Sequence, residues 1–234
     1  MNKEIIINQE GFKILPGFIP SKYIVDFKLR LKDLYPVRAS SSQKIYAEGE
    51  NIKNLPDISV WWSQTVIDFP EIQTIAKLVT PIVKDVSQNL ELYSSDVVCI
   101  NPGSNWISAH VDTPHRFSKW NFDKRLLGIQ CIITLDDTTI DEGVTGLVPF
   151  SQKRDFDINK CYAGEYDRWF LENCKQNYMS RGSLLFYNCR VLHSSMPNKS
   201  EKVRSVLLIN YLDKTLINEV SKIDNIWSSN GKRS

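Results

Sequence analysis

The stretch Ser108-Ala109-His110-Val111-Asp112-Thr113-Pro114 decides how the rest of this 234-residue chain is interpreted. On an extended strand, side chains two residues apart point to the same face, so the His110 imidazole and the Asp112 carboxylate should lie side by side. With one more distant histidine, they would form the two-histidine, one-carboxylate face that binds non-haem Fe(II) and leaves coordination positions open. Because His-x-Asp also arises by chance, the triplet alone does not identify a metal site.

Candidates for the third ligand are few, because the chain contains three histidines, His110, His115 and His193. His193 comes shortly after the apolar run Ser183–Tyr187, which has the composition of a strand. His115 directly follows a proline that should break the metal-binding strand, so we expect it in a surface loop. The sequence therefore predicts a metal site made of His110, Asp112 and His193.

A second motif lies in the stretch from His193 to Tyr211, HSSMPNKSEKVRSVLLINY. Here the chain resembles the phytanoyl-CoA dioxygenase family of Fe(II)/2-oxoglutarate oxygenases. That family shows His-x-Asp, then a distal His followed by Asn-x-Ser and by an Arg at the spacing seen here. The matching positions are His110, Asp112, His193, Asn198, Ser200 and Arg204.

This resemblance implies that the three predicted ligands hold Fe(II), that 2-oxoglutarate chelates the metal and that O₂ takes the remaining position. Arg204 would pair with the distal carboxylate of 2-oxoglutarate, because its planar and permanently charged fork matches a carboxylate. Arg204 shares strand parity with Val206 and Leu208, so it should face inward, where an unpaired charge is costly. Ser195, two residues after His193, is the second expected contact to that carboxylate.

Gln130 is the lone amide on an apolar stretch, residues 126–135, that reads as a strand. A buried amide needs hydrogen-bond partners. It is therefore either a contact to the cofactor or metal centre, or a core polar group satisfied by its neighbours.

The segment from Glu142 to Gln152, EGVTGLVPFSQ, resembles the family's Asn-Gly…Pro-Gly-Ser-His segment. Phe150 replaces the usual Gly and Gln152 replaces the usual His. Neither position is a metal ligand in the family, so these departures concern the subfamily and the substrate rather than the chemistry.

The segment His115–Arg125, HRFSKWNFDKR, alternates cations with aromatic residues directly after the metal motif. We expect it at the pocket mouth, where loops usually carry specificity. Arg116 and Lys119 would attract an anionic group of the substrate, while Trp120 would cover an apolar part. The alternative is a solvated loop whose aromatic residues pack on the barrel. Trp61 and Trp62 are the next candidates, although core or rim packing also explains them.

The expected function is hydroxylation of a small molecule with release of succinate and CO₂. Relatives that halogenate carry Ala or Gly in place of the carboxylate, so Asp112 favours hydroxylation or another oxidation such as desaturation. Two alternatives stay open. One is a zinc hydrolase, which the spacing of Arg204 argues against. The other is a non-catalytic, cupin-like binding or sensor domain.

Composition points to a globular protein of the cytoplasm. A net charge of +2 gives no reason to expect binding to nucleic acid or to a membrane surface. Five cysteines without a CxxC pair favour free thiols in a reducing compartment. The N-terminal apolar run is too short for a signal peptide, and nothing in the sequence requires a protein partner.

The pattern of elements predicts a mainly β fold with flanking α-helices. Amphipathic helices are expected from Ser21 and from Pro70, with a polar loop over residues 37–58 between them. From about residue 90, short apolar strands follow one another. We therefore predict a single domain over residues 1–234, with a helical part at about 1–90, a double-stranded β-helix (jelly-roll, cupin-like) core at about 91–214, and a loosely attached polar tail from about 222.

Overall fold

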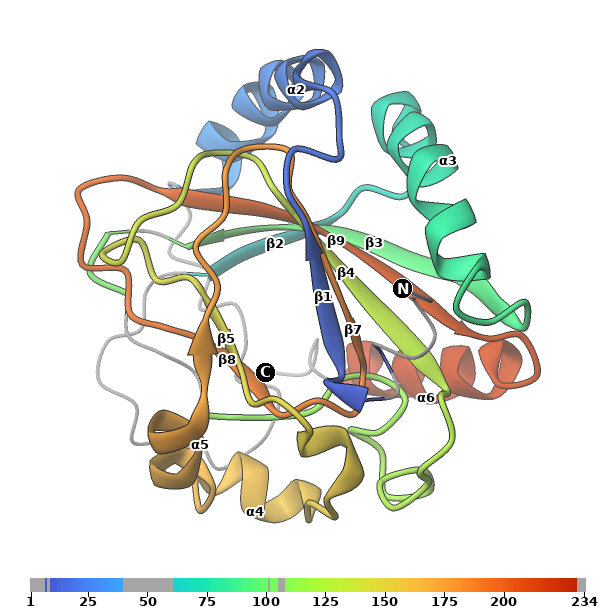
Figure 1. Cartoon of the computed structure of the whole chain (residues 1–234). Coiled ribbons are helices and arrows are strands. Elements are labelled where there is room, and N and C mark those ends of the chain that lie inside the picture. Colours follow the sequence, from blue (N-terminus) through green and yellow to red (C-terminus); the bar gives the residue numbers. More distant parts are fainter. Residues whose placement is uncertain (1–6, 8, 40–60, 101, 105–107, 231–234) are drawn as a thin grey trace.

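The computed structural model describes residues 7, 9–39, 61–100, 102–104 and 108–230 (Figure 1). Its strands are β1 (Phe12–Leu15), β2 (Trp61–Thr65), β3 (Leu90–Ile100), β4 (Gly128–Thr134), β5 (Thr145–Leu147), β6 (Lys175–Gln176), β7 (Leu184–Asn188), β8 (His193–Ser195) and β9 (Arg204–Asp213). They form a six-stranded sheet in the order β1-β7-β4-β9-β3-β2 and a three-stranded sheet in the order β6-β5-β8. Neighbouring strands pair antiparallel throughout.

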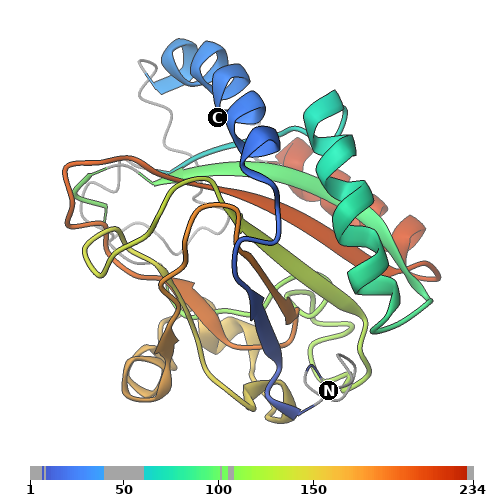
Figure 2. The same ribbon diagram turned by 45° about the horizontal axis from the view of Figure 1, so that its top comes forward.

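The helices are α2 (Ser21–Ala39), α3 (Pro70–Lys84), α4 (Ile158–Tyr162), α5 (Asp167–Asn173) and α6 (Ile217–Asn230), with a 3-10 turn at Ser151–Lys153. Figures 1 and 2 show α2 and α3 over one face of the six-stranded sheet, with α4 and α5 beneath the three-stranded sheet. The buried side chains Ile24, Phe27 and Leu31 place the apolar face of α2 against the larger sheet.

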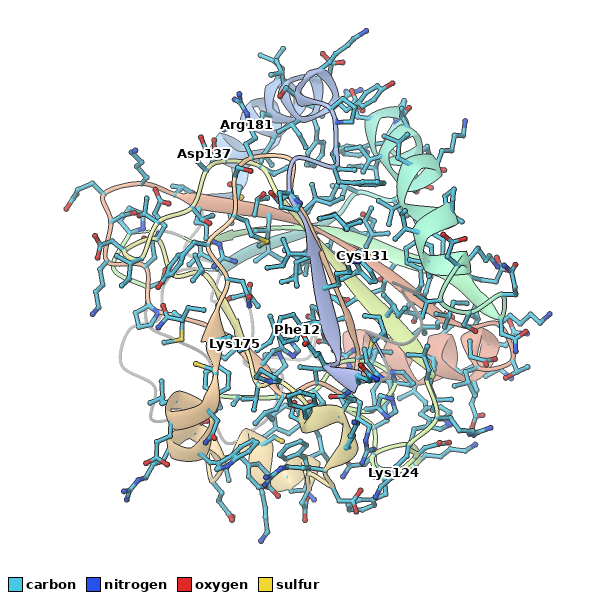
Figure 3. All side chains as sticks on the ribbon, viewed as in Figure 1. Phe12, Lys124, Cys131, Asp137, Lys175 and Arg181 are labelled. Atoms are coloured by element: carbon cyan, nitrogen blue, oxygen red, sulfur yellow. The ribbon has the colours of Figure 1, made fainter. Side chains whose placement is uncertain are left out.

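Strand β4 shows how one sheet serves two cores. Ile129, Cys131 and Ile133 belong to the cluster under α2 and α3, and Cys131 is labelled in Figure 3. Ile132 points the other way, into the cluster between the two sheets. Side chains alternate along a strand, so Gln130 also faces the three-stranded sheet. Both faces of β4 are therefore buried, which explains its nearly continuous apolar sequence.

The predicted fold class is confirmed: the core consists of two facing antiparallel sheets, with helices packed outside. The end of the chain differs from the prediction. The segment expected as a loose polar tail from about residue 222 is part of α6, in which Val220 is fully buried. The apolar residues Leu216, Ile217, Val220 and Ile223 give the start of α6 one face that packs on the barrel. The side chains after residue 223 lie outside the described part of the chain.

Helix α2 runs to Ala39, so the first residues of the expected polar loop are helical. The rest of that loop, residues 40–58, lies outside the described part of the chain. No helix in the described ranges is both long and apolar enough to cross a membrane. That the whole chain forms one domain stays a prediction.

Candidate metal centre

The backbone at His110 is held against β8. The amide of His110 donates to the carbonyl of His193, and the amide of His193 donates to the carbonyl of His110, both at 3.0 Å. These two bonds form an isolated bridge, so the expected strand is reduced to one paired position. The bridge still ties the two histidines to one another although they are far apart in the sequence.

The local alternation predicted for this segment is present. Ala109 and Val111 are buried in the cluster that contains residues of α4 and α5, on the outer side of the smaller sheet. The amide of Ala109 donates to the Asp167 carboxylate at 2.9 Å, which fixes the segment to the start of α5. His110 and Asp112 therefore lie on the opposite side, facing the space between the sheets.

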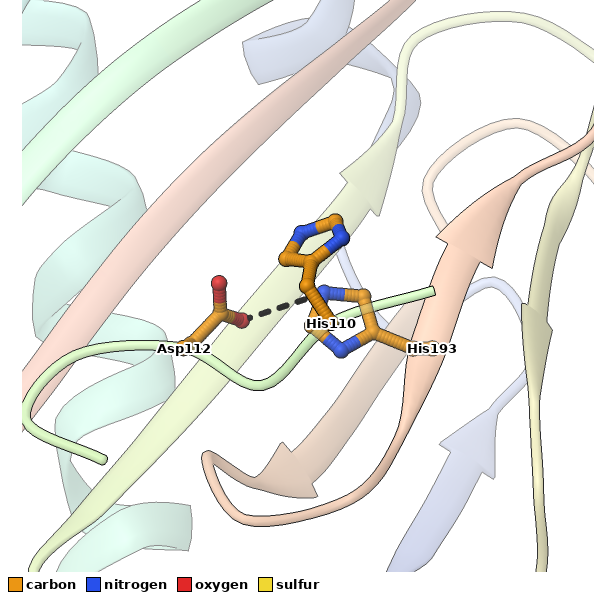
Figure 4. Close-up of side chains that lie close together, drawn as sticks. All are labelled: His110, Asp112 and His193. Atoms are coloured by element: carbon orange, nitrogen blue, oxygen red, sulfur yellow. Dashed lines mark ion pairs between the residues drawn. The ribbon is translucent and has the colours of Figure 1, made fainter. Parts of the chain in front are cut away.

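The three predicted ligands converge (Figure 4). One ligand atom from each of His110, Asp112 and His193 lies within 4.8 Å of the others. Asp112 Oδ2 is 3.3 Å from His193 Nε2, and the two imidazole centroids are 4.4 Å apart. A cluster of this size matches three donors arranged around one cation.

Backbone carbonyls set the tautomers of both histidines. His110 Nδ1 lies 2.9 Å from the carbonyl oxygen of Ser108, and His193 Nδ1 lies 3.0 Å from that of Val191. Because a carbonyl only accepts, each Nδ1 carries a proton, and Nε2 is the ring nitrogen that remains to bind a metal. Burial, and next the nearby His193, lower the pKa of His110 to about 4. His110 is therefore neutral at neutral pH, as a metal ligand must be.

Tyr187 contacts the metal cluster, and the sequence reasoning missed it. Its hydroxyl donates to Asp112 Oδ2 at 2.8 Å and lies 3.2 Å from His193 Nε2. The ring is buried, and burial together with the Asp112 carboxylate raises the pKa of the phenol. The alternation of β7 carried this signal, because Tyr187 shares its face with Leu185, which packs between the sheets.

Arg204 lies at the start of β9 with its side chain buried. It donates to the Gly143 carbonyl and, at 3.4 Å, to the Thr145 hydroxyl, whereas its Nε has no hydrogen-bond partner. No carboxylate of the described residues forms an ion pair with it. Burial lowers its pKa to about 10, against the opposing charge of Glu142. The guanidinium is therefore a buried cation whose charge is not neutralised by contact.

The surroundings of Arg204 mix hydroxyl and amide groups with apolar side chains. The residues packed around it are Ile132, Thr134, Thr138, Val144, Thr145, Asn177, Met179 and Val206. Thr145 pairs with Ser195 in the β5–β8 register. Ser195, which is buried, thus lies between the Arg204 end of the barrel and His193.

Gln130 lies at the other end of the barrel from Arg204. Its cross-strand neighbours are Tyr187 and Asn210. Asn210 is six residues along β9 from Arg204, which corresponds to about 20 Å. The side chain is 5% exposed, and its Oε1 has no hydrogen-bond partner in the described structure. Gln130 is therefore too far from Arg204 for both side chains to contact the same small carboxylate.

The loop after Asp112 is only partly as expected. Trp120 is buried against Leu127 and Leu212, and Lys119 pairs with Glu219 of α6 at the surface. Arg116 is half-buried, and its charge lowers the pKa of His110. The amide of Arg116 also donates to the carbonyl of the ligand residue Asp112 at 3.0 Å, which places Arg116 beside the metal cluster. The side chains of Trp61 and Trp62 lie outside the described structure.

The expectation of a surface position for His115 was wrong. The side chain is fully buried, and its Nδ1 lies 3.0 Å from the carbonyl oxygen of Trp120. Consecutive turns fold this loop back on itself, since Phe117 bonds to Pro114 and Trp120 bonds to Phe117. Burial lowers the pKa of His115 to about 4.

Arg190 holds the turn that precedes His193. Its buried guanidinium donates to the carbonyls of Asn121, Asp123, Gln152 and Arg154 and to the carboxylate of Asp155. It therefore ties the β7–β8 turn to the loop after Asp112 and to the segment after β5. Buried Arg bonded to several carbonyls is a structural clamp, and no pattern in the sequence distinguished it from a surface Arg.

The two departures from the family pattern have structural roles. Phe150 has φ of 64°, the left-handed region that favours Gly. Its ring is exposed, and the Lys153 ammonium lies 5.5 Å from the ring centroid. Gln152 is buried and donates to the Gln9 carbonyl at 3.0 Å, which fixes the chain before β1. Neither residue belongs to the metal cluster.

The sequence profile described as phytanoyl-CoA dioxygenase (PhyH) matches residues 7–206. No curated protein matches the chain in sequence. Among solved structures, the non-haem α-ketoglutarate-dependent epimerase SnoN from nogalamycin biosynthesis is 14% identical, with a TM-score of 0.69 over 90% of this chain and 79% of its own. The α-ketoglutarate-dependent carbocyclase SnoK is 17% identical, with a TM-score of 0.66 over 90% and 83%.

HygX from Streptomyces hygroscopicus, solved with nickel and 2-oxoglutarate, is 14% identical, with a TM-score of 0.66 over 90% of this chain and 85% of its own. At these identities the likeness demonstrates the shared double-stranded β-helix fold, and the profile match demonstrates the family.

Proposed function

The chain belongs to the phytanoyl-CoA dioxygenase (PhyH) family, and from this premise we propose that it is an Fe(II)- and 2-oxoglutarate-dependent oxygenase. The observation that carries the proposal is the pairing of two features inside one barrel. The ligand atoms of two histidines and one carboxylate lie within 4.8 Å of one another. Arg204, which is buried and has an unbonded Nε, contacts Thr145, and the cross-strand partner of Thr145 is Ser195, two residues after the ligand His193.

His110, Asp112 and His193 would hold Fe(II). The donor set fits, since the backbone bonds to Nδ1 leave both Nε2 atoms to bind the metal, and Asp112 adds a carboxylate. The residues around these ligands fit as well. Each Nδ1 is bonded to a carbonyl, and Tyr187 donates to the carboxylate, as outer contacts of metal ligands commonly do.

Arg204 would bind the distal carboxylate of 2-oxoglutarate, assisted by the hydroxyls of Ser195 and Thr145. A buried guanidinium with an unpaired N–H is satisfied best by a carboxylate, which accepts two parallel bonds. When bound, Fe(II) and 2-oxoglutarate supply an oxidant from O₂ at the cost of decarboxylating 2-oxoglutarate to succinate and CO₂. The chain's part is to hold these groups between two apolar sheets and away from water.

Hydroxylation is the outcome that we propose, because Asp112 completes the ligand set. The titles of similar structures name an epimerase and a carbocyclase, and these are reactions of those proteins. Mass spectrometry of the product separates the three outcomes: hydroxylation adds one oxygen, oxidative cyclisation removes two hydrogens, and epimerisation leaves the mass unchanged.

The substrate is proposed to be a small molecule, with Arg116 as the residue that would contact an anionic group on it. Arg116 is close enough to the cluster to influence the pKa of His110. We place the protein in the cytoplasm, consistent with cysteines that are free rather than paired.

One assay tests the reaction class. The purified chain is incubated with Fe(II), ascorbate and 2-oxoglutarate, and release of succinate and CO₂ is measured, including the slow turnover that occurs without substrate. We expect both products in equal amounts, and no turnover when Zn²⁺ replaces Fe(II). A zinc hydrolase or a non-catalytic binding domain would give neither product, and that result would refute the proposal.

A further inference from the structure

A row of polar side chains crosses the inner face of the six-stranded sheet and ends at the metal cluster. In the strand register Tyr187 lies opposite Gln130, Gln130 opposite Asn210, and Asn210 opposite Ser94. Side chains paired in this way lie about 5 Å apart. We call these four residues the polar row. Asn210 donates to the Ser94 hydroxyl at 3.0 Å, which confirms that both side chains lie on the same face.

The polar row leads from the metal cluster toward solvent. Tyr187 is 1% exposed and bonded to Asp112, and Gln130 is 5% exposed. Asn210 and Ser94, further from the cluster, are half-buried. Asn210 and Ser94 are therefore more accessible than Tyr187 and Gln130. A molecule that approaches the cluster over this part of the sheet would contact hydrogen-bonding groups along its whole path.

Gln130 carries an unsatisfied acceptor in this row. Its Oε1 is buried and has no hydrogen-bond partner among the described residues. The adjacent row of cross-strand partners, one step closer to Arg204, is apolar and consists of Leu185, Ile132 and Leu208. A buried unpaired acceptor destabilises a fold, and an apolar side chain would fill this position without that cost. The amide is therefore best explained by a group that is absent from the free protein.

We propose that the polar row is the surface on which the primary substrate binds, and that this substrate is rich in hydroxyl groups, as a sugar or polyol is. The inference rests on the proposed function. Oε1 of Gln130 can only accept, so its partner must present an O–H or N–H. Asn210 and Ser94 both donate and accept, which suits a hydroxyl group. An alkyl chain over the same row would leave the Gln130 acceptor unsatisfied and would exclude water from Asn210 and Ser94, which disfavours acyl substrates.

The stability of a near-isosteric variant gives the first test. Gln130→Met removes the unpaired acceptor and keeps the length of the side chain. We expect the thermal midpoint of the free protein to rise by roughly 2–6 °C. Gln130→Leu serves as a second variant in case the thioether packs poorly. A fall of the midpoint in both variants would mean that the amide is a satisfied core group, and the proposal would be wrong.

Substrate-dependent turnover gives the second test. Hexoses, hexose phosphates, uronic acids, methyl hexosides, disaccharides and inositols are compared with straight-chain alcohols and fatty acids of matched carbon number. Stimulation of succinate release is measured relative to each variant's own rate without the compound. We expect stimulation by at least one hydroxyl-rich compound, none by the alkyl series, and a loss of stimulation of at least tenfold in Gln130→Met. Gln88→Met, an exposed position after α3, is the matched control and should retain it.

Three results would overturn the proposal: stimulation by the alkyl series, no stimulation by any hydroxyl-rich compound, or full stimulation in both Gln130 variants. Failure of the proposed function is seen separately, because the wild-type protein would then release no succinate even without added compounds.

Discussion

The hydroxyl of Tyr187 donates to Asp112 Oδ2 at 2.8 Å, and this contact joins β7 of the large sheet to the carboxylate of the metal cluster. The same hydroxyl lies 3.2 Å from His193 Nε2. A donor on one carboxylate oxygen restricts how the other can turn, so Tyr187 fixes the orientation of Asp112 before any metal binds. Residues that orient ligands in this way usually affect metal affinity strongly.

Tyr187→Phe should therefore weaken divalent metal binding by roughly 10- to 100-fold while the fold is retained. Titration with Co(II), followed by its visible absorption, measures the affinity directly and without turnover. Tyr211→Phe is the matched control, because Tyr211 is also buried and its hydroxyl bonds to Thr80 at 2.9 Å on the helix side of the sheet. Equal affinities in wild type and Tyr187→Phe would show that the phenol does not position the carboxylate.

The ligand assignment predicts the loss of a spectroscopic signal. Fe(II) and 2-oxoglutarate added anaerobically should give a weak visible charge-transfer band. We expect His110→Ala and His193→Ala to abolish the band, because each removes one of three protein donors. His115→Asn should keep it, since His115 points to the Trp120 carbonyl rather than into the cluster. An unchanged band in either alanine variant contradicts the assignment.

Arg204→Ala should raise the concentration of 2-oxoglutarate needed for half-saturation by roughly one to three decades. Loss of a charge-assisted pair in a closed pocket typically costs on the order of 2–5 kcal/mol, part of which comes from the partner charge left unpaired. The measurement is a saturation curve of succinate release against 2-oxoglutarate, with circular dichroism to verify folding. The half-saturating concentration for Arg204→Lys should lie between those of the wild type and Arg204→Ala. A curve that overlays the wild type would assign Arg204 another role.

Arg116 and Lys119 are expected to differ, although the sequence placed them in one role. Arg116→Gln should lower substrate-stimulated turnover, because Arg116 lies near the metal cluster. Lys119→Gln should have little effect, since Lys119 is at the surface and already paired with Glu219. Equal losses in both variants would mean that the loop acts as a structural unit.

Acid should destabilise the protein partly through His115. Its pKa is about 4 in the folded chain, below the ordinary value of 6.5, so the unfolded chain binds the extra proton first. The contribution of neutral, buried His115 to the free energy of unfolding is complete above pH 6.5. It is lost as the pH falls toward 4, by about 3 kcal/mol in total. Urea unfolding at several pH values measures this loss. The free energy of unfolding should fall less steeply with decreasing pH in His115→Asn than in the wild type. An unchanged dependence on pH would show that His115 stays protonated or accessible in the folded chain.

The resemblance to the phytanoyl-CoA dioxygenase family supported His193 as the third ligand and implied the role of Arg204. Local backbone geometry predicted how the side chains are oriented: alternation along an extended segment placed His110 and Asp112 on one face, and the same rule turned Arg204 inward beside Val206 and Leu208. These orientations did not require knowledge of which strands are neighbours. The helices from Ser21 and Pro70 were predictable for the same reason, because caps and apolar periodicity are local.

Tertiary structure alone decided what surrounds those residues. Tyr187 contacts Asp112, and Gln130 lies with Asn210 rather than beside Arg204, because strand register joins positions that are distant in the sequence. The burial of His115 follows from a loop that folds under its own aromatic residues. These long-range contacts decide which polar groups are paired and which acceptor is left without a partner. Residue type and spacing along the chain do not reveal such contacts, because the contacts join residues that are far apart in the sequence.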